Sequence, residues 1–71
     1  MNIWILVRLY VDGHDEIRGV FESRDAAVVA AEKQKAEFGQ RNRVSDRGWQ
    51  DDYLPLWESE GISMSNWRVE A

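Results

Sequence analysis

The residues that could do acid, base or metal chemistry are few, and most of them are close together in the sequence. The only histidine, His14, lies within two residues of Asp12, Asp15 and Glu16. A metal site needs three or four converging ligands, and this spacing does not match the aspartate pattern of a calcium-binding loop. We therefore interpret the stretch as a solvated turn, and we predict neither a bound metal nor a cofactor.

Two carboxylate pairs occur near the C-terminus, Asp51 with Asp52 and Glu58 with Glu60. Adjacent residues of a strand point to opposite faces, so the first pair is poorly placed to act together. The second pair can share a face, but acid–base catalysis also requires a substrate held within reach in a pocket. The 71-residue chain contains no nucleophile-elbow or phosphate-loop glycine pattern. We therefore predict that the protein is not an enzyme.

Tryptophan is unusually frequent, with four in 71 residues. The segment 49–60, WQDDYLPLWESE, combines aromatic and aliphatic side chains with four acids. Aromatic residues dominate the energetics of protein interfaces, so this segment is our predicted partner-binding surface. Its predicted contact residues are Trp49, Asp51, Asp52, Tyr53, Trp57, Glu58 and Glu60. The alternative is that the segment folds over the sheet and completes the core, and we expect Trp67 and either Trp4 or Trp57 in that core.

The net charge of -4 is unevenly distributed. Residues 1–47 hold eight basic and eight acidic side chains, so the whole excess lies in residues 48–71. An acidic balance disfavours nucleic-acid binding and suits a protein partner with a basic surface. The alternative is a small nucleic-acid-binding or regulatory protein that contacts phosphates through the loop residues Arg41, Arg43 and Arg47.

The length predicts one small domain over residues 1–71. The chain has no cysteine, which suits a reducing compartment. No apolar run approaches the ~20 residues of a membrane span, and the apolar start of the chain is interrupted by Arg8, so we interpret it as a strand. We expect a cytoplasmic protein without a membrane association.

The order of patterns predicts an α+β fold of the type ββαβ. Strands are expected at residues 3–11 and 16–21, joined by an Asp-Gly hairpin turn. A helix is expected at about residues 23–38, with Ser23 as its N-cap and an alanine-rich buried face. The last strand, at residues 62–70, is expected beside the first, which gives a mainly antiparallel sheet of order 2-1-3. An edge hairpin from residues 54–64 would add a fourth strand.

The first predicted strand is apolar on both faces, and one helix can cover only one of them. We expect the helix to leave the face with Trp4, Leu6 and Tyr10 open. We expect either the C-terminal segment or a partner to cover the face with Trp4, Leu6 and Tyr10. A structural homodimer formed through that face is a further alternative.

The motif Gly19–Ala27, GVFESRDAA, places a strand end before a serine-led, alanine-rich helix. With residues 3–38 around it, it resembles small ββαβ-type proteins of unknown function from bacteria and their phages. The resemblance implies a fold and a phage or mobile-element origin, and it implies no activity. Together with the acidic segment, it suggests a protein-binding inhibitor of a host defence complex, similar in kind to an anti-CRISPR protein.

Overall fold

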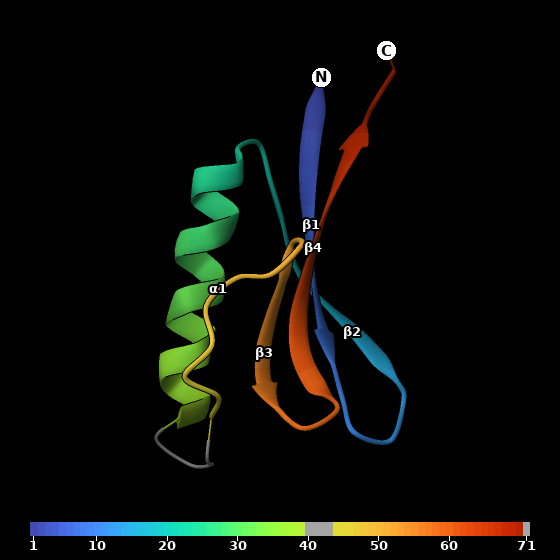
Figure 1. The fold of residues 1–71 in the computed structure, drawn as a ribbon. Coiled ribbons are helices and arrows are strands. Elements are labelled where there is room, and N and C mark those ends of the chain that lie inside the picture. Colours follow the sequence, from blue (N-terminus) through green and yellow to red (C-terminus); the bar gives the residue numbers. More distant parts are fainter. Residues whose placement is uncertain (40–43, 71) are drawn as a thin grey trace.

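The computed structural model describes residues 1–39 and 44–70. It confirms the predicted α+β class, with one helix on one face of a four-stranded antiparallel sheet (Figure 1). The elements in chain order are β1 (Asn2–Leu9), β2 (Asp15–Phe21), α1 (Arg24–Gly39), β3 (Tyr53–Trp57) and β4 (Glu60–Arg68). In this part of the chain, no helix is long and apolar enough to cross a membrane.

The strand order is β2-β1-β4-β3, which differs from the predicted order 2-1-3. The last strand does lie beside the first, but the chain forms the additional strand β3 before it returns to β1. β3 contains Pro55, which lacks a backbone N–H and is therefore suited to an edge strand. The edge position of β3 is thus the place where this segment can join the sheet.

A β-bulge in β2 decides which of its side chains share a face. Leu6 pairs with Gly19 and Val7 pairs with Ile17, so Arg18 is the extra residue. A one-residue bulge shifts the alternation of faces. As a result Ile17 and Val20 lie on the same face, although their numbers differ in parity.

The helix α1 begins where the sequence predicts it. The Ser23 hydroxyl accepts a hydrogen bond from the Ala26 backbone N–H at 3.1 Å, which satisfies one unpaired donor of the first turn. Ala27 and Ala31 are fully buried against the sheet. Their small side chains let the helix lie close to the strands, so the strands supply most of the core volume.

The core is formed by the even-numbered residues of three strands and the alanine face of α1. Its buried members are Leu6, Ala27, Ala31, Leu54, Leu56, Ile62 and Met64. Leu6 pairs with Met64, and Leu54 pairs with Ile62, so these side chains share the helix-facing side of the sheet.

The predicted assignment of the two faces of β1 is therefore wrong. Leu6 is fully buried beneath α1, and Trp4 packs against the same core. The guanidinium of Arg8 lies over the ring of Tyr10 and over the ring of Phe38 from α1. The even-numbered side chains of β1 thus face the helix, and the face left open carries the odd-numbered ones.

The expectation that Trp67 belongs to the core is also wrong. The β1–β4 register runs without a shift from Asn2 and Arg68 to Leu9 and Gly61, so no bulge interrupts β4. Trp67 consequently lies opposite Ile3 on the open side of the sheet, and it is 57% exposed.

Candidate functional site

The predicted partner-binding segment is divided between the two ends of β3. Before the strand, the chain reverses at Asp51 and Asp52, which both have positive φ, of 49° and 63°. Gln50 and Tyr53 exchange two backbone hydrogen bonds of 2.8 Å across this turn, as in a type I′ hairpin. Trp57 and Glu58 lie at the opposite end of the strand. Five residues at ~3.3 Å each separate the two groups by roughly 16 Å.

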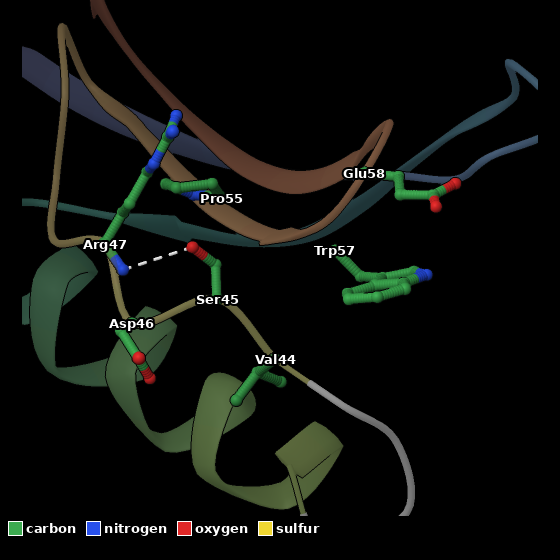
Figure 2. A pocket seen from close by; sticks show the side chains of 7 residues that line it. All are labelled: Val44, Ser45, Asp46, Arg47, Pro55, Trp57 and Glu58. Carbon is green, nitrogen blue, oxygen red and sulfur yellow. Dashed lines mark hydrogen bonds between the residues drawn. The ribbon is translucent and has the colours of Figure 1, made fainter.

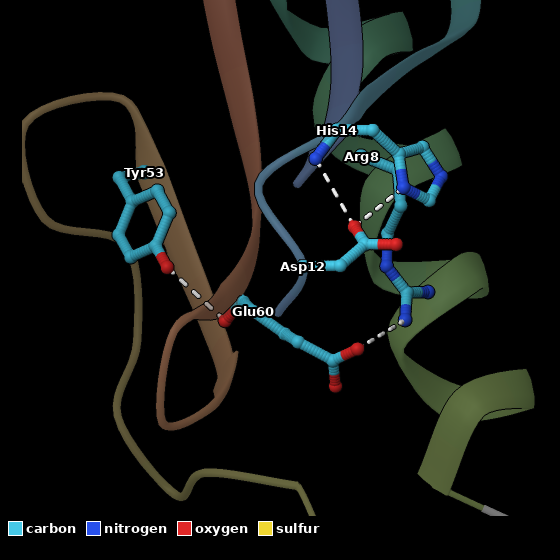
Figure 3. A network of polar contacts seen from close by, with 5 residues as sticks. All are labelled: Arg8, Asp12, His14, Tyr53 and Glu60. Atoms are coloured by element: carbon cyan, nitrogen blue, oxygen red, sulfur yellow. Dashed lines mark hydrogen bonds and ion pairs between the residues drawn. The ribbon is translucent and has the colours of Figure 1, made fainter. Parts of the chain in front are cut away.

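Three of the seven predicted contact residues take part in the fold itself. The Trp49 side chain packs against the core, and its Nε1 donates a hydrogen bond to Glu32 at 3.0 Å. The Tyr53 hydroxyl donates to the Glu60 carbonyl oxygen at 3.1 Å (Figure 3). These aromatic residues therefore cover the sheet edge and fix the β3–β4 hairpin.

The acidic side chains of the segment differ strongly in exposure. Glu60 is 3.9 Å from the guanidinium of Arg8, and both side chains are largely buried. Asp52 is 3.7 Å from Arg24, but both of these side chains are about half exposed. Asp51 and Glu58 are exposed. The segment therefore presents separate acids at two places on the surface.

Trp57 and Glu58 line an open groove of about 500 Å³ (Figure 2). Its other wall is the segment 44–47, which follows the outer edge of β3, where the Ser45 backbone N–H donates to the Leu56 carbonyl oxygen. Asp46 and Arg47 add charges of opposite sign. The groove therefore combines the indole ring of Trp57 with side chains of both charges.

Of the three arginines predicted to contact nucleic acid, the structure describes only Arg47. Arg41 and Arg43 lie outside the described residues. Arg47 is exposed, and its carbonyl oxygen accepts a hydrogen bond from Lys35 Nζ at 3.3 Å. A cluster of three arginines at this loop stays a prediction.

His14 belongs to the β1–β2 turn, where it interacts with its neighbours in the sequence. Its ring stacks on Tyr10 with centroids 4.3 Å apart, and its Nδ1 is hydrogen-bonded to Asp12 Oδ1 (Figure 3). The hydrogen bonds from the His14 backbone N–H and ring lower the pKa of the Asp12 carboxyl. Across residues 1–39 and 44–70, no group of three or more acidic or histidine side chains is placed to hold a metal ion.

The side of the sheet that faces away from α1 is a mainly apolar surface. We call it the open face, and it is defined by the side chains that the strand pairing places on that side: Ile3, Ile5, Val7, Leu9, Asp15, Ile17, Val20, Tyr53, Pro55, Ser63, Ser65 and Trp67. In Figure 1, α1 lies on the other side of the sheet. Ile17 and Trp67 are 69% and 57% exposed. Asp15, at the end of β2 beside Leu9, is the one charged side chain of this set.

Sequence reasoning found the strand that is apolar on both faces, but it predicted the wrong face to be covered by the helix. The signal that was available is the parity of the other strands. Leu54, Leu56, Ile62 and Met64 all have even numbers, and a regular antiparallel pairing with β1 brings Leu6 to their side.

Comparisons with protein-family models, with curated proteins and with solved structures gave no match for this chain. The resemblance to small bacterial and phage proteins therefore stays a prediction.

Proposed function

We propose that the protein is a non-enzymatic protein-binding module that contacts its partner through the open face. The observation that supports this function is a mainly apolar sheet face, charged only at Asp15 on its edge, with no covering layer from α1. Large exposed apolar patches on small proteins mark interaction sites. Aromatic residues such as Trp67 are enriched in the centres of protein interfaces.

The size of the open face suits this role. Strands of about seven residues at ~3.3 Å each, in four rows ~4.8 Å apart, give a flat area of roughly 440 Å². This is about a tenth of the accessible surface of 5067 Å², which is the share that a small protein typically contributes to a specific interface.

Site-specific photocrosslinking in the cells that produce the protein tests this function. A benzoyl-phenylalanine is placed at position 17, on the open face, or at position 29, on the outer side of α1. Ile17 and Val29 are both 69% exposed, so the two positions are matched in access. We expect protein adducts from position 17 and not from position 29. The absence of adducts from position 17, or equal adducts from both, would overturn the proposed surface.

The narrower hypothesis, an anti-CRISPR-like inhibitor that docks on a basic protein, concerns a second surface. It requires Trp57 and Glu58 at one end of β3, or Asp51 and Asp52 at the other, to contact the partner. Capture of a basic partner by such a surface weakens at high salt, because exposed charges are screened. The matched variants are Trp57→Ala and the pair Asp51→Asn with Asp52→Asn, and unchanged capture by both would exclude this surface.

A further inference from the structure

We infer that the open face is covered by a second copy of this chain, packed sheet against sheet. The inference rests on the proposed function, because it names the partner of the same face. Two sheets that pack face to face form a sandwich about 10 Å thick, with their strands within about 30° of each other. Each copy then supplies the layer that the other lacks.

The first argument is the area that such a pairing buries. Two open faces of roughly 440 Å² each remove roughly 900 Å² of flat area from water, and side chains that project from the sheet raise the accessible area above this figure. A stable biological interface starts at about 1,000 Å². The face is therefore large enough for a dimer when all four strands take part.

The second argument is charge. The open face carries a single charged side chain, Asp15 at its edge beside Leu9, so two copies of it meet with only one acid from each. The excess acids lie elsewhere, with Asp51 and Asp52 in the turn before β3 and Glu58 in the turn after it. A basic partner could form ion pairs at this face only with Asp15, whereas an identical apolar face gains contact over its whole length.

The third argument is the thin core of a single copy. On α1 only two alanines are fully buried, and the odd-numbered aliphatic side chains of β1, which are Ile3, Ile5, Val7 and Leu9, lie outside the core. Short chains bury a small share of their apolar surface, and oligomerisation is a common way to bury more. A two-layer sandwich with one helix outside each sheet buries this row.

Sedimentation equilibrium of the purified full-length chain tests the inference. We expect the wild-type protein to approach twice the 8.3 kDa of one chain as its concentration rises. Ile17→Glu places a charge in the open face and should return the mass to that of one chain. Val29→Glu adds the same charge at an equally exposed position on α1 and should leave the association unchanged.

A second open-face variant and a salt series complete the test of the dimer. Val20→Glu, at a position that is 57% exposed in one copy, should also give a monomer if Ile17→Glu fails to fold, and circular dichroism reports the folding of each variant. Higher salt should strengthen the association, because it screens the repulsion between two copies that each carry a net charge of -4. A monomer at all concentrations, or a dimer that persists in both folded variants, would overturn the inference.

The crosslinking experiment separates this inference from the proposed function. An adduct from position 17 at twice the mass of one chain agrees with both. An adduct from position 17 to a different protein alone supports the proposed function and overturns the second copy. The absence of any adduct from position 17 overturns both.

Discussion

The ion pair between Arg8 and Glu60 gives the sharpest test of how the core tolerates charge. The side chains are only 12% and 15% exposed, and the shortest distance between their charged atoms is 3.9 Å. The guanidinium also lies 4.8 Å from the Tyr10 ring centroid and 4.2 Å from that of Phe38. In residues 1–39 and 44–70, no hydrogen-bond partner is present for the buried Arg8 Nε.

The magnitudes follow from this arrangement. At an effective dielectric constant of about 20, two unit charges 3.9 Å apart attract by roughly 4 kcal/mol, and the loss of hydration offsets a large part of this attraction. The two rings add about 0.5 to 1 kcal/mol each to the stability of the cation. Arg8→Met keeps the contact with the rings but leaves the Glu60 carboxylate largely buried without its cation. We therefore expect a cost of about 2 to 3 kcal/mol in the free energy of unfolding.

The partner variant Glu60→Gln should cost less, about 1 kcal/mol, because the cation keeps both rings and an amide oxygen can still accept a hydrogen bond. The double variant removes both charges from the core and should cost about 1 to 2 kcal/mol, since a buried ion pair and apolar or neutral groups of similar size are often close in stability. The resulting coupling energy is about 2 kcal/mol. Urea unfolding of the four proteins at neutral pH, followed by tryptophan fluorescence, measures it.

The control is the pair Arg24 and Asp52, which is closer at 3.7 Å but about half exposed on both sides. Surface pairs of this kind contribute about 0 to 1 kcal/mol. The cycle of Arg24→Met and Asp52→Asn should give a coupling below about 0.5 kcal/mol, within the scatter of additive changes. A coupling at Arg8 and Glu60 that is no larger than the control would show that burial does not strengthen this pair, and our reasoning would be wrong.

Three further predictions concern local features. Ser23→Ala removes the N-cap of α1 and should lower the free energy of unfolding by about 1 kcal/mol in urea unfolding, whereas Ser23→Asp should retain it. A Cβ at Gly61 would overlap the Tyr53 ring. Gly61→Ala should therefore lower the free energy of unfolding by about 1 to 3 kcal/mol, because it displaces the ring and its hydrogen bond. The same cost in a Tyr53→Ala background would refute this explanation. The hydrogen bond from Arg18 lowers the pKa of the Glu16 carboxyl. This interaction therefore stabilises the folded protein fully above the unfolded-state pKa of about 4.3, and its contribution is lost as the pH falls through the lowered folded-state pKa. An NMR titration of the Glu16 carboxyl should show a higher pKa after Arg18→Gln, and an unchanged pKa would contradict this cause.

Several local elements follow from neighbouring residues alone. The Asp-Gly turn, the serine cap and the alanine face of α1 were predictable, because each depends on backbone conformation or on contacts within a few residues. The bulge in β2 lies next to Gly19, and glycine inside a strand often marks such an irregularity. The candidate site was less predictable, because Trp49, Tyr53 and Glu60 combine the residue types of an interface with contacts inside the fold.

The sequence by itself determined that this chain forms two N-terminal strands, a capped helix and a C-terminal strand, and that its first strand is apolar on both faces. Only the tertiary structure decided which of those faces is covered. The register of β4 places Met64 beside Leu6, and the extra residue Arg18 in β2 turns Ile17 and Val20 to the same side. A shift of one residue exchanges the two faces of a strand, so the open face depends on pairings between residues that are far apart in the chain.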